Sequence, residues 1–146
     1  MAGLLRITEA ASLALHAGVM LSSHPERRFS AASLARVLGA SPAHMAKVLQ
    51  RLAKAGILAS TRGKGGGFRL AADPARTSLL DLYRAIEGPL PEKGCLLAEP
   101  LCRGGCCILG DLPGRVESMV RERLSRTTLA QLAGAEDCLP APEPGA

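Results

Sequence analysis

Four of the five cysteines of this 146-residue chain lie in one short segment: Cys95, Cys102, Cys106 and Cys107. An odd number of cysteines, crowded in this way, does not fit the disulfide framework of a small secreted domain. Thiolates are soft ligands that suit iron–sulfur centres or zinc, and nearby glycines such as Gly104 and Gly105 let backbone amides approach sulfur. The segment therefore predicts metal or redox chemistry inside a cell. The fifth cysteine, Cys138, is expected to be an uninvolved thiol.

A long basic stretch offers a second chemistry, the binding of phosphates. Between Arg27 and Leu70 there are nine Lys or Arg residues and no Asp or Glu, in a chain of net charge +5. Such a block neutralises phosphates and releases their counterions, whereas a chain that needed only solubility would mix the two signs. An enzyme has the least support, because no acid–base pair or nucleophile with its base stands out. The glycines at 65–67 precede an expected strand rather than a helix, so they do not fit a nucleotide-binding fingerprint.

A helix that begins after Ser41 would position part of this charge. Ser41 is a suitable N-cap, Pro42 fits the first helical position, and Gly56 supplies a left-handed stop. The spacing of one buried helical face is met by Met45, Val48, Leu49 and Leu52. Beyond the helix, two short strands at 57–61 and 68–70 flank a basic, glycine-rich turn.

An apolar-backed helix followed by a basic hairpin is typical of a winged helix-turn-helix in a mainly α fold. The helix would enter the major groove, and the hairpin would follow the backbone or the adjacent minor groove. The residues expected to contact DNA are Ser41, Pro42, Ala43, His44, Lys47 and Arg51 of the helix and Arg62, Lys64, Gly65, Gly66 and Arg69 of the hairpin. The alternative is a solvated basic face beside a flexible turn, and the pairing of helix and hairpin argues against it.

Capping residues mark further helices around this pair. Ser30 is expected to cap a helix that ends at Gly39, so that only a tight connection separates it from Ser41. Thr77 or Ser78 is expected to cap a helix after the hairpin.

The most apolar stretch, 10–21, predicts a largely buried first helix capped by Thr8. His16 within it is interpreted as a packed core histidine. The stretch is far shorter than the roughly 20 residues that a membrane span needs, and Ser12 and His16 interrupt it. We therefore expect a cytoplasmic protein with no membrane partner.

The chain divides into four expected parts. They are a winged helix-turn-helix DNA-binding domain (1–88), a cysteine-rich sensor loop (89–110), a long helix with a final turn (111–133) and a disordered tail (134–146). Asp111 is expected to cap the long helix, and Glu117–Arg121 and Glu122–Arg126 have favourable i, i+4 spacing. One face of the helix is apolar: Leu112, Val116, Met119, Val120 and Leu124. Because paired DNA half-sites need paired heads, we expect this face to form a homodimer.

Five segments carry a resemblance to a known family: 41–47 (SPAHMAK), 52–58 (LAKAGIL), 62–70 (RGKGGGFRL), 85–89 (AIEGP) and 128–132 (TLAQL). In these the chain resembles the bacterial winged-helix transcription regulators typified by IscR, NsrR, RsrR and CymR. The likeness covers about 5 to 132, and its most specific parts are the hairpin and the stop at 87–89. The resemblance implies a major-groove helix, a minor-groove turn, and a dimer formed through the helix from Pro113 to about Arg126.

Members of that family that act as sensors hold an iron–sulfur cluster with three cysteines of this loop. The resemblance implies Cys95, Cys102 and Cys107 here, with Cys106 as an alternative or a fourth ligand, and a 2Fe–2S rather than a 4Fe–4S cluster. The spacing after Cys102 is shorter than in most relatives. Ser12 stands where some relatives supply a carboxylate. The fourth ligand therefore stays open among Glu9 of a partner subunit, Cys106, His16 and His24.

The resemblance thus implies a dimeric DNA-binding transcription regulator, expected to be a repressor. Its affinity for its operator would depend on the cluster, which would sense redox state, nitric oxide or iron–sulfur status. One alternative is a regulator of the same fold controlled by thiol–disulfide exchange, zinc, another metal or haem. Another is a redox protein whose basic face binds an acidic protein partner.

Overall fold

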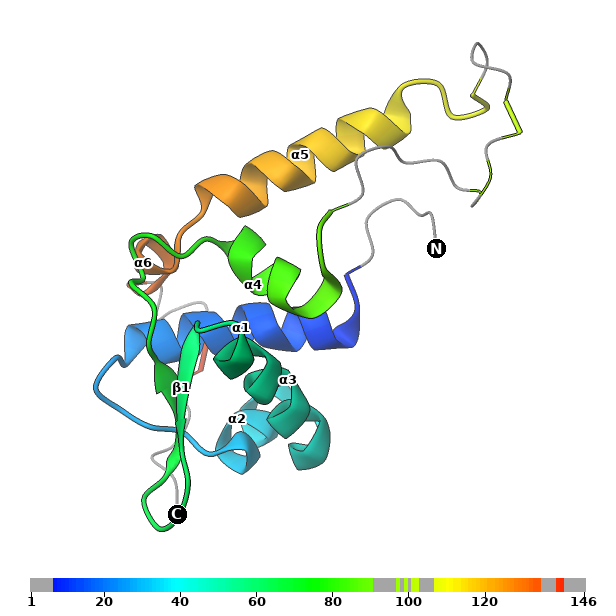
Figure 1. Cartoon of the computed structure of the whole chain (residues 1–146). Helices are drawn as coiled ribbons and strands as arrows, with labels where there is room; N and C mark the ends of the chain where they lie inside the picture. Colours follow the sequence, from blue (N-terminus) through cyan, green and yellow to red (C-terminus); the bar gives the residue numbers. More distant parts are fainter. Residues whose placement is uncertain are drawn as a thin grey trace.

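Six helices and one two-stranded hairpin occur in the part of the chain that a computed structural model describes: 7–90, 97, 99, 101, 102, 107–134, 139 and 140. In chain order they are α1 (Glu9–Ser23), α2 (Ala31–Leu38), α3 (Pro42–Lys54), β1 (Leu58–Thr61), β2 (Gly67–Leu70), α4 (Leu79–Glu87), α5 (Leu112–Arg126) and α6 (Leu129–Leu132). Figure 1 shows α1 across the middle of the molecule, with α2, α3 and the hairpin on one side and α4 and α5 on the other. Cys95, Cys106 and Cys138 lie outside the described residues, as does most of the predicted loop and tail.

Side-chain caps begin four of the helices, α1 to α4, at residues that the sequence predicts. Ser41 Oγ accepts the backbone N–H of His44 at 3.1 Å at the start of α3. Ser78, rather than Thr77, caps α4 and forms a capping box with Asp81. These bonds satisfy amides that the first helical turn leaves unpaired. Caps of the same kind begin α1, α2 and α6 at Thr8, Ser30 and Thr128.

The buried face predicted for α3 and the buried residues of α4 form a core around α1. Its fully buried members include Leu21, Leu34, Met45, Leu49, Leu52 and Leu82. Helices α1 and α4 approach so closely that a Cβ at Gly18 would lie 2.8 Å from Leu82 Cδ1. Burying one such aliphatic side chain contributes about 1.5–3 kcal/mol. The core therefore fixes the backbone of α3 while the opposite face of that helix stays open.

The hairpin is paired to a further chain segment that the sequence did not indicate. Strands β1 and β2 pair antiparallel, and Phe29, between α1 and α2, exchanges two backbone hydrogen bonds of 2.9 Å with Phe68 of β2. At Gly67 (φ +140°) a Cβ would lie 2.7 Å from the Phe29 carbonyl oxygen, so a side chain there would obstruct this approach. The turn at 62–66 thus projects from a strand, β2, that is paired along both edges.

Helix α5 departs from the prediction at its start, whereas its apolar face is largely open. Asp111 has helical backbone angles and caps no amide, and its carboxylate lies 3.9 Å from Arg115 instead. An N-cap needs an extended backbone to aim its oxygen at the following amides, so the predicted cap is wrong. Of the apolar face only Leu124 is buried, whereas Leu112 and Met119 are 48% and 69% exposed.

The end of α5 is nevertheless tied to the start of α4. The N–H of Leu79 donates to Thr127 O, and the N–H of Leu129 donates to Thr77 O, both at 2.9 Å. Along the helix, the predicted ion pairs are present at 2.9 Å (Glu117–Arg121) and 2.8 Å (Glu122–Arg126). The two backbone hydrogen bonds thus hold the C-terminal end of the long helix against the start of α4.

His16 is exposed, so its interpretation as a packed core histidine is wrong. Leu13, Ala14 and Ala17 are buried around it, but His16 lies on the same side of α1 as Glu9, and both side chains are exposed. Its Nδ1 lies 2.7 Å from the carbonyl oxygen of Ser12. The apolar composition of the stretch did not reveal which sector stays open.

Candidate nucleic-acid interface

The open face of α3 carries the helix residues that the sequence assigns to DNA contact. Ser41, Pro42, Ala43 and Lys47 are exposed, and His44 is partly exposed. The N-terminal end of a helix presents free amides and partial positive charge, which favours an approaching phosphate. The buried Met45 and Leu49 behind this face hold it in position.

The hairpin turn has a backbone that depends on its glycines. Gly63 and Gly65 have φ values of +91° and +75°, which glycine adopts most readily. A Cβ at Gly66 would lie only 2.3 Å from the carbonyl oxygen of Thr61, so no larger residue fits without moving the backbone. Gly65 and Gly66 therefore shape the turn, while the exposed side chains of Arg62 and Lys64 carry its charge.

The cations of this surface lack carboxylate partners among the described residues. Among the described residues, the acids in salt bridges are Glu9, Asp111, Glu117 and Glu122. Only Glu9 forms a salt bridge with the basic stretch between Arg27 and Leu70, where its partner is His44. Lys47, Arg62, Lys64 and Arg69 are exposed and form none. Unpaired positive charge held on rigid elements suits an anionic partner.

Arg51 has a contact that the sequence did not indicate. Its guanidinium Nη2 donates a hydrogen bond to the backbone carbonyl of Ile86, near the end of α4. Arg51 thereby ties the second half of α3 to α4. A DNA contact through its remaining N–H groups stays a prediction.

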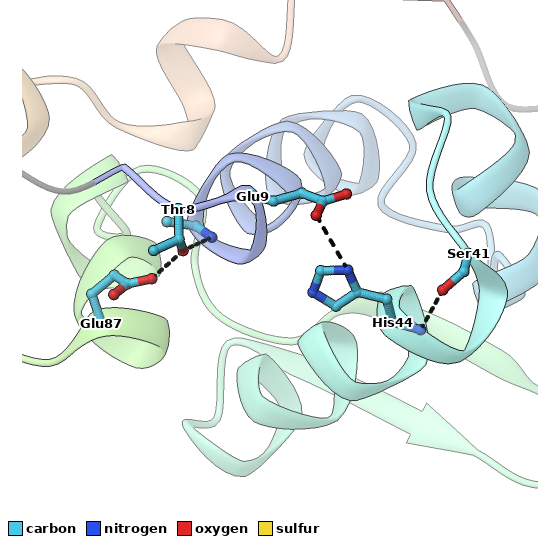
Figure 2. Close-up of polar contacts among 6 residues, drawn as sticks. Thr8, Glu9, Ser41, His44 and Glu87 are labelled. Atoms are coloured by element: carbon cyan, nitrogen blue, oxygen red, sulfur yellow. Dashed lines mark hydrogen bonds and ion pairs between the residues drawn. The ribbon is translucent and has the colours of Figure 1, made fainter.

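The start of α1 bridges α4 and α3. Figure 2 shows Thr8 directed at Glu87 of α4 and Glu9 directed at His44 of α3. The Thr8 hydroxyl donates to Glu87 Oε1, and Glu9 Oε2 lies 3.8 Å from His44 Nδ1. Burial and the Glu87 carboxylate both raise the pKa of Tyr83, so this phenol stays neutral beside the bridge. Glu9, one of the candidate cluster ligands, thus has a neighbour within its own chain.

Two of the candidate cysteine ligands lie in the described part of the chain. Cys102 and Cys107 are free thiols and both are exposed. The carbonyl of Cys107 accepts the N–H of Gly110 at 2.9 Å in a turn that leads into α5. Cys95 and Cys106 lie outside the described residues, and within those residues no three His, Cys, Asp or Glu side chains converge on a metal site.

Three contacts between distant parts of the chain could not be predicted from the sequence. The bonds Thr8–Glu87 and Arg51–Ile86 and the pairing Phe29–Phe68 each join residues that no local pattern connects. They depend on how the helices pack, which a periodicity does not specify.

Comparison with known proteins decides the family. A sequence model of the Rrf2 family, described as an iron-dependent transcriptional regulator, matches residues 7–135. The chain belongs to the Rrf2 family. Rrf2 proteins are transcription regulators rather than enzymes, as the absence of a catalytic motif in the sequence predicted.

Individual Rrf2 relatives agree with this assignment. A protein of Rhodopseudomonas palustris named as the HTH-type transcriptional regulator BadM is 37% identical over 83 residues, 57% of this chain and 53% of that protein. The match thus spans about half the length of that curated relative. CymR of B. subtilis, the global cysteine regulator, superposes with a TM-score of 0.73 at 26% identity, covering 90% of this chain and 98% of its own.

A further Rrf2 structure supports the fold alone. IscR of T. potens has a TM-score of 0.68 at 23% identity, over 97% of this chain and 94% of its own. The predicted mainly helical, winged helix-turn-helix fold is therefore confirmed. No helix of the described residues is long and apolar enough to cross a membrane.

Proposed function

We propose that this Rrf2 regulator is a cytoplasmic, homodimeric repressor that places α3 in the major groove and the hairpin turn in the minor groove of an operator. One observation carries the proposal: the open face of α3 and the turn at 62–66 hold exposed cations that have no carboxylate partners among the described residues. Both lie on the side of α1 away from α5 (Figure 1), which leaves α5 free for a second copy.

The proposal is tested by selecting binding sites from a pool of random duplexes with the full-length protein. Enrichment of one two-fold symmetric site is expected, because a dimer presents two heads. In the enriched site, Lys47→Ala and Arg62→Ala should each weaken binding by about 1–3 kcal/mol if the side chain contacts a base, or mainly flatten the salt dependence if it contacts phosphate. Arg84→Ala, an exposed arginine of α4, is the matched control. No enrichment, or equal loss in the control, would contradict the proposal.

The exposed apolar side chains of α5 support the homodimer. Met119 and Leu112 are exposed, and so is Ile108 (93%) just before the helix. Apolar groups that gather on one exposed helix face favour burial against another chain. A second copy, related by two-fold symmetry, would bury this face and set the distance between the two α3 helices.

For the sensing function we favour a 2Fe–2S cluster held by Cys95, Cys102 and Cys107. The donor set fits, since the two described thiols are free and exposed, and the family is described as iron-dependent. When bound, the cluster would supply a thiolate-ligated iron centre that oxidants or nitric oxide can attack. The fourth ligand stays open. His16 is exposed with Nδ1 near Ser12 O, Glu9 lies beside His44, and Cys106 and His24 remain candidates.

A chain of contacts links the cysteine-rich segment, 89–110, to the proposed DNA-binding face of α3. The segment begins just after Glu87 of α4, which Thr8 contacts, and Glu9 next to Thr8 reaches His44 of α3. Drawing Cys95, Cys102 and Cys107 together would fix α5 relative to α4, and with it the spacing of the two heads. Iron and sulfide analysis of anaerobically purified protein, followed by operator binding with and without the metal, tests this. Colourless protein without iron or sulfide would contradict it.

Thiol–disulfide switching is the second candidate for regulation. Cys102 and Cys107 are free and exposed, and both are therefore accessible to oxidants. A relative at 26% identity and TM-score 0.69, Staphylococcus aureus CymR, has been solved in an oxidized form. Operator binding that responds to oxidant in iron-free protein, and is restored by reductant, would favour this alternative.

A further inference from the structure

Three arginines lie close to the bridge that joins Phe29 to the hairpin. Phe29 and Phe68 form an isolated antiparallel bridge, so Arg28, which precedes Phe29, and Arg69, which follows Phe68, lie at the same end of it. Phe29 is fully buried, whereas Arg28, Arg69 and the neighbouring Arg27 are exposed. These arginines form a basic face beside the hairpin.

Like charges that lie near one another repel unless an opposite charge lies nearby. Within the described residues, the side chains of Arg27, Arg28 and Arg69 form no ion pair, and Glu26, the nearest acid in the sequence, pairs with none of them. The positive charge on this face is uncompensated in the free protein.

The backbone that carries these charges is firmly held. Phe29 is anchored by burial and by two hydrogen bonds, and its approach to β2 depends on Gly67. The N–H of Arg27 donates to His24 O at 3.0 Å, and the His24 ring lies 5.9 Å from that of Phe29. Cations on a fixed backbone lose little conformational freedom when they bind, which favours affinity.

We propose that Arg27, Arg28 and Arg69 form a second phosphate-binding site. It would bind DNA backbone phosphates that lie beyond those contacted by the hairpin turn. The inference rests on the proposed function, because its ligand is the same duplex. It adds Arg27 and Arg28 to the interface and lengthens the footprint. Contacts to phosphate raise affinity for every sequence alike and steepen its dependence on salt.

The test compares Arg27→Ala/Arg28→Ala with wild-type full-length protein on the selected operator over a range of KCl concentrations. Each phosphate contact contributes about 0.9 to the slope of log K against log [salt]. The double variant should therefore lower the slope by about 2 per protomer while keeping the preference for the operator over a scrambled duplex. Arg28→Lys should keep its share of the slope, since the charge remains. The hydroxyl-radical footprint should lose protection at its outer edge only.

A matched control removes two charges elsewhere. Arg76 and Arg84 line the cleft between the end of α3 and the start of α4, and Arg76→Ala/Arg84→Ala should leave the slope unchanged. An unchanged slope in Arg27→Ala/Arg28→Ala, with wild-type binding intact, overturns the second site alone. An equal loss in both double variants also overturns it. Failure of the wild type to bind any duplex overturns the proposed function and this inference together.

Discussion

Glu9 Oε2 lies 3.8 Å from His44 Nδ1, which brings a carboxylate from α1 to the first turn of α3 (Figure 2). The Glu9 side chain is 70% exposed and that of His44 is 36% exposed, so the pair itself contributes little to stability. Its importance lies in its position. A negative charge at the edge of the proposed DNA-binding surface would oppose non-specific attachment to DNA.

Glu9→Gln should therefore bind duplex DNA more tightly. Removing one exposed carboxylate near the phosphates should increase affinity about two- to fivefold at low salt, below about 1 kcal/mol, and the gain should shrink as salt screens it. Binding to a scrambled duplex at two salt concentrations measures the effect. Asp111→Asn removes an equally exposed carboxylate from the start of α5 and should change nothing. Weaker binding by Glu9→Gln would show that the pair supports the interface instead.

Local features of the fold could be predicted from the sequence, whereas contacts between distant segments could not. Ser41 and Ser78 could be predicted as caps because each accepts a hydrogen bond from the backbone N–H only three residues further along the chain. In the segment between α1 and α2, only Phe29 pairs with β2, so this segment shows no alternation of apolar and polar residues that would predict a strand. His16 failed as a core residue because burial depends on which neighbours cover a helix, and only packing decides that.

In the candidate site, too, local features could be predicted from the sequence and contacts between distant segments could not. The buried and open faces of α3 followed from a helical period, so the expected exposure of Lys47 was correct. The bond from Arg51 to Ile86 depends on the crossing of α3 and α4, and no spacing encodes it. Asp111 has the right residue type for a cap but the wrong backbone angles, which its neighbours determine.

The hairpin turn should not tolerate a side chain at position 66. Gly66→Ala would place a Cβ 2.3 Å from Thr61 O, a backbone atom that cannot turn aside, so the turn must distort. Overpacking of this kind costs about 1–3 kcal/mol, and the displaced Arg62 and Lys64 should weaken operator binding as well. Urea unfolding and operator titration measure the two effects. Gly114→Ala, in the first turn of α5 with no atom within 4 Å, should be neutral or stabilising by up to about 1 kcal/mol. Equal behaviour of the two variants would contradict the clash.

The open face of α5 should hold two chains together. Met119→Glu would place a charge on that face, where the methionine is 69% exposed in the single chain. If a second copy covers the face, burying the charge should cost at least about 2 kcal/mol, which corresponds to roughly 30-fold weaker dimerisation. Sedimentation analysis over a range of protein concentrations measures the shift toward monomer. Ala32→Glu introduces the same charge on the exposed side of α2 and should leave the dimer intact. An unaltered dimer in Met119→Glu would place the interface elsewhere.

Cys102 should be required for the metal centre, whereas Cys138 should not. Replacing one of three thiolate ligands removes a strong bond that the hydroxyl of serine replaces poorly. Cys102→Ser, purified without oxygen, should therefore lose most of its iron, sulfide and visible absorption, and Cys138→Ser should keep all three. Comparing Cys106→Ser with Cys107→Ser then decides the third ligand, since the true ligand alone should abolish the cluster. Full iron content in Cys102→Ser would remove this cysteine from the ligand set.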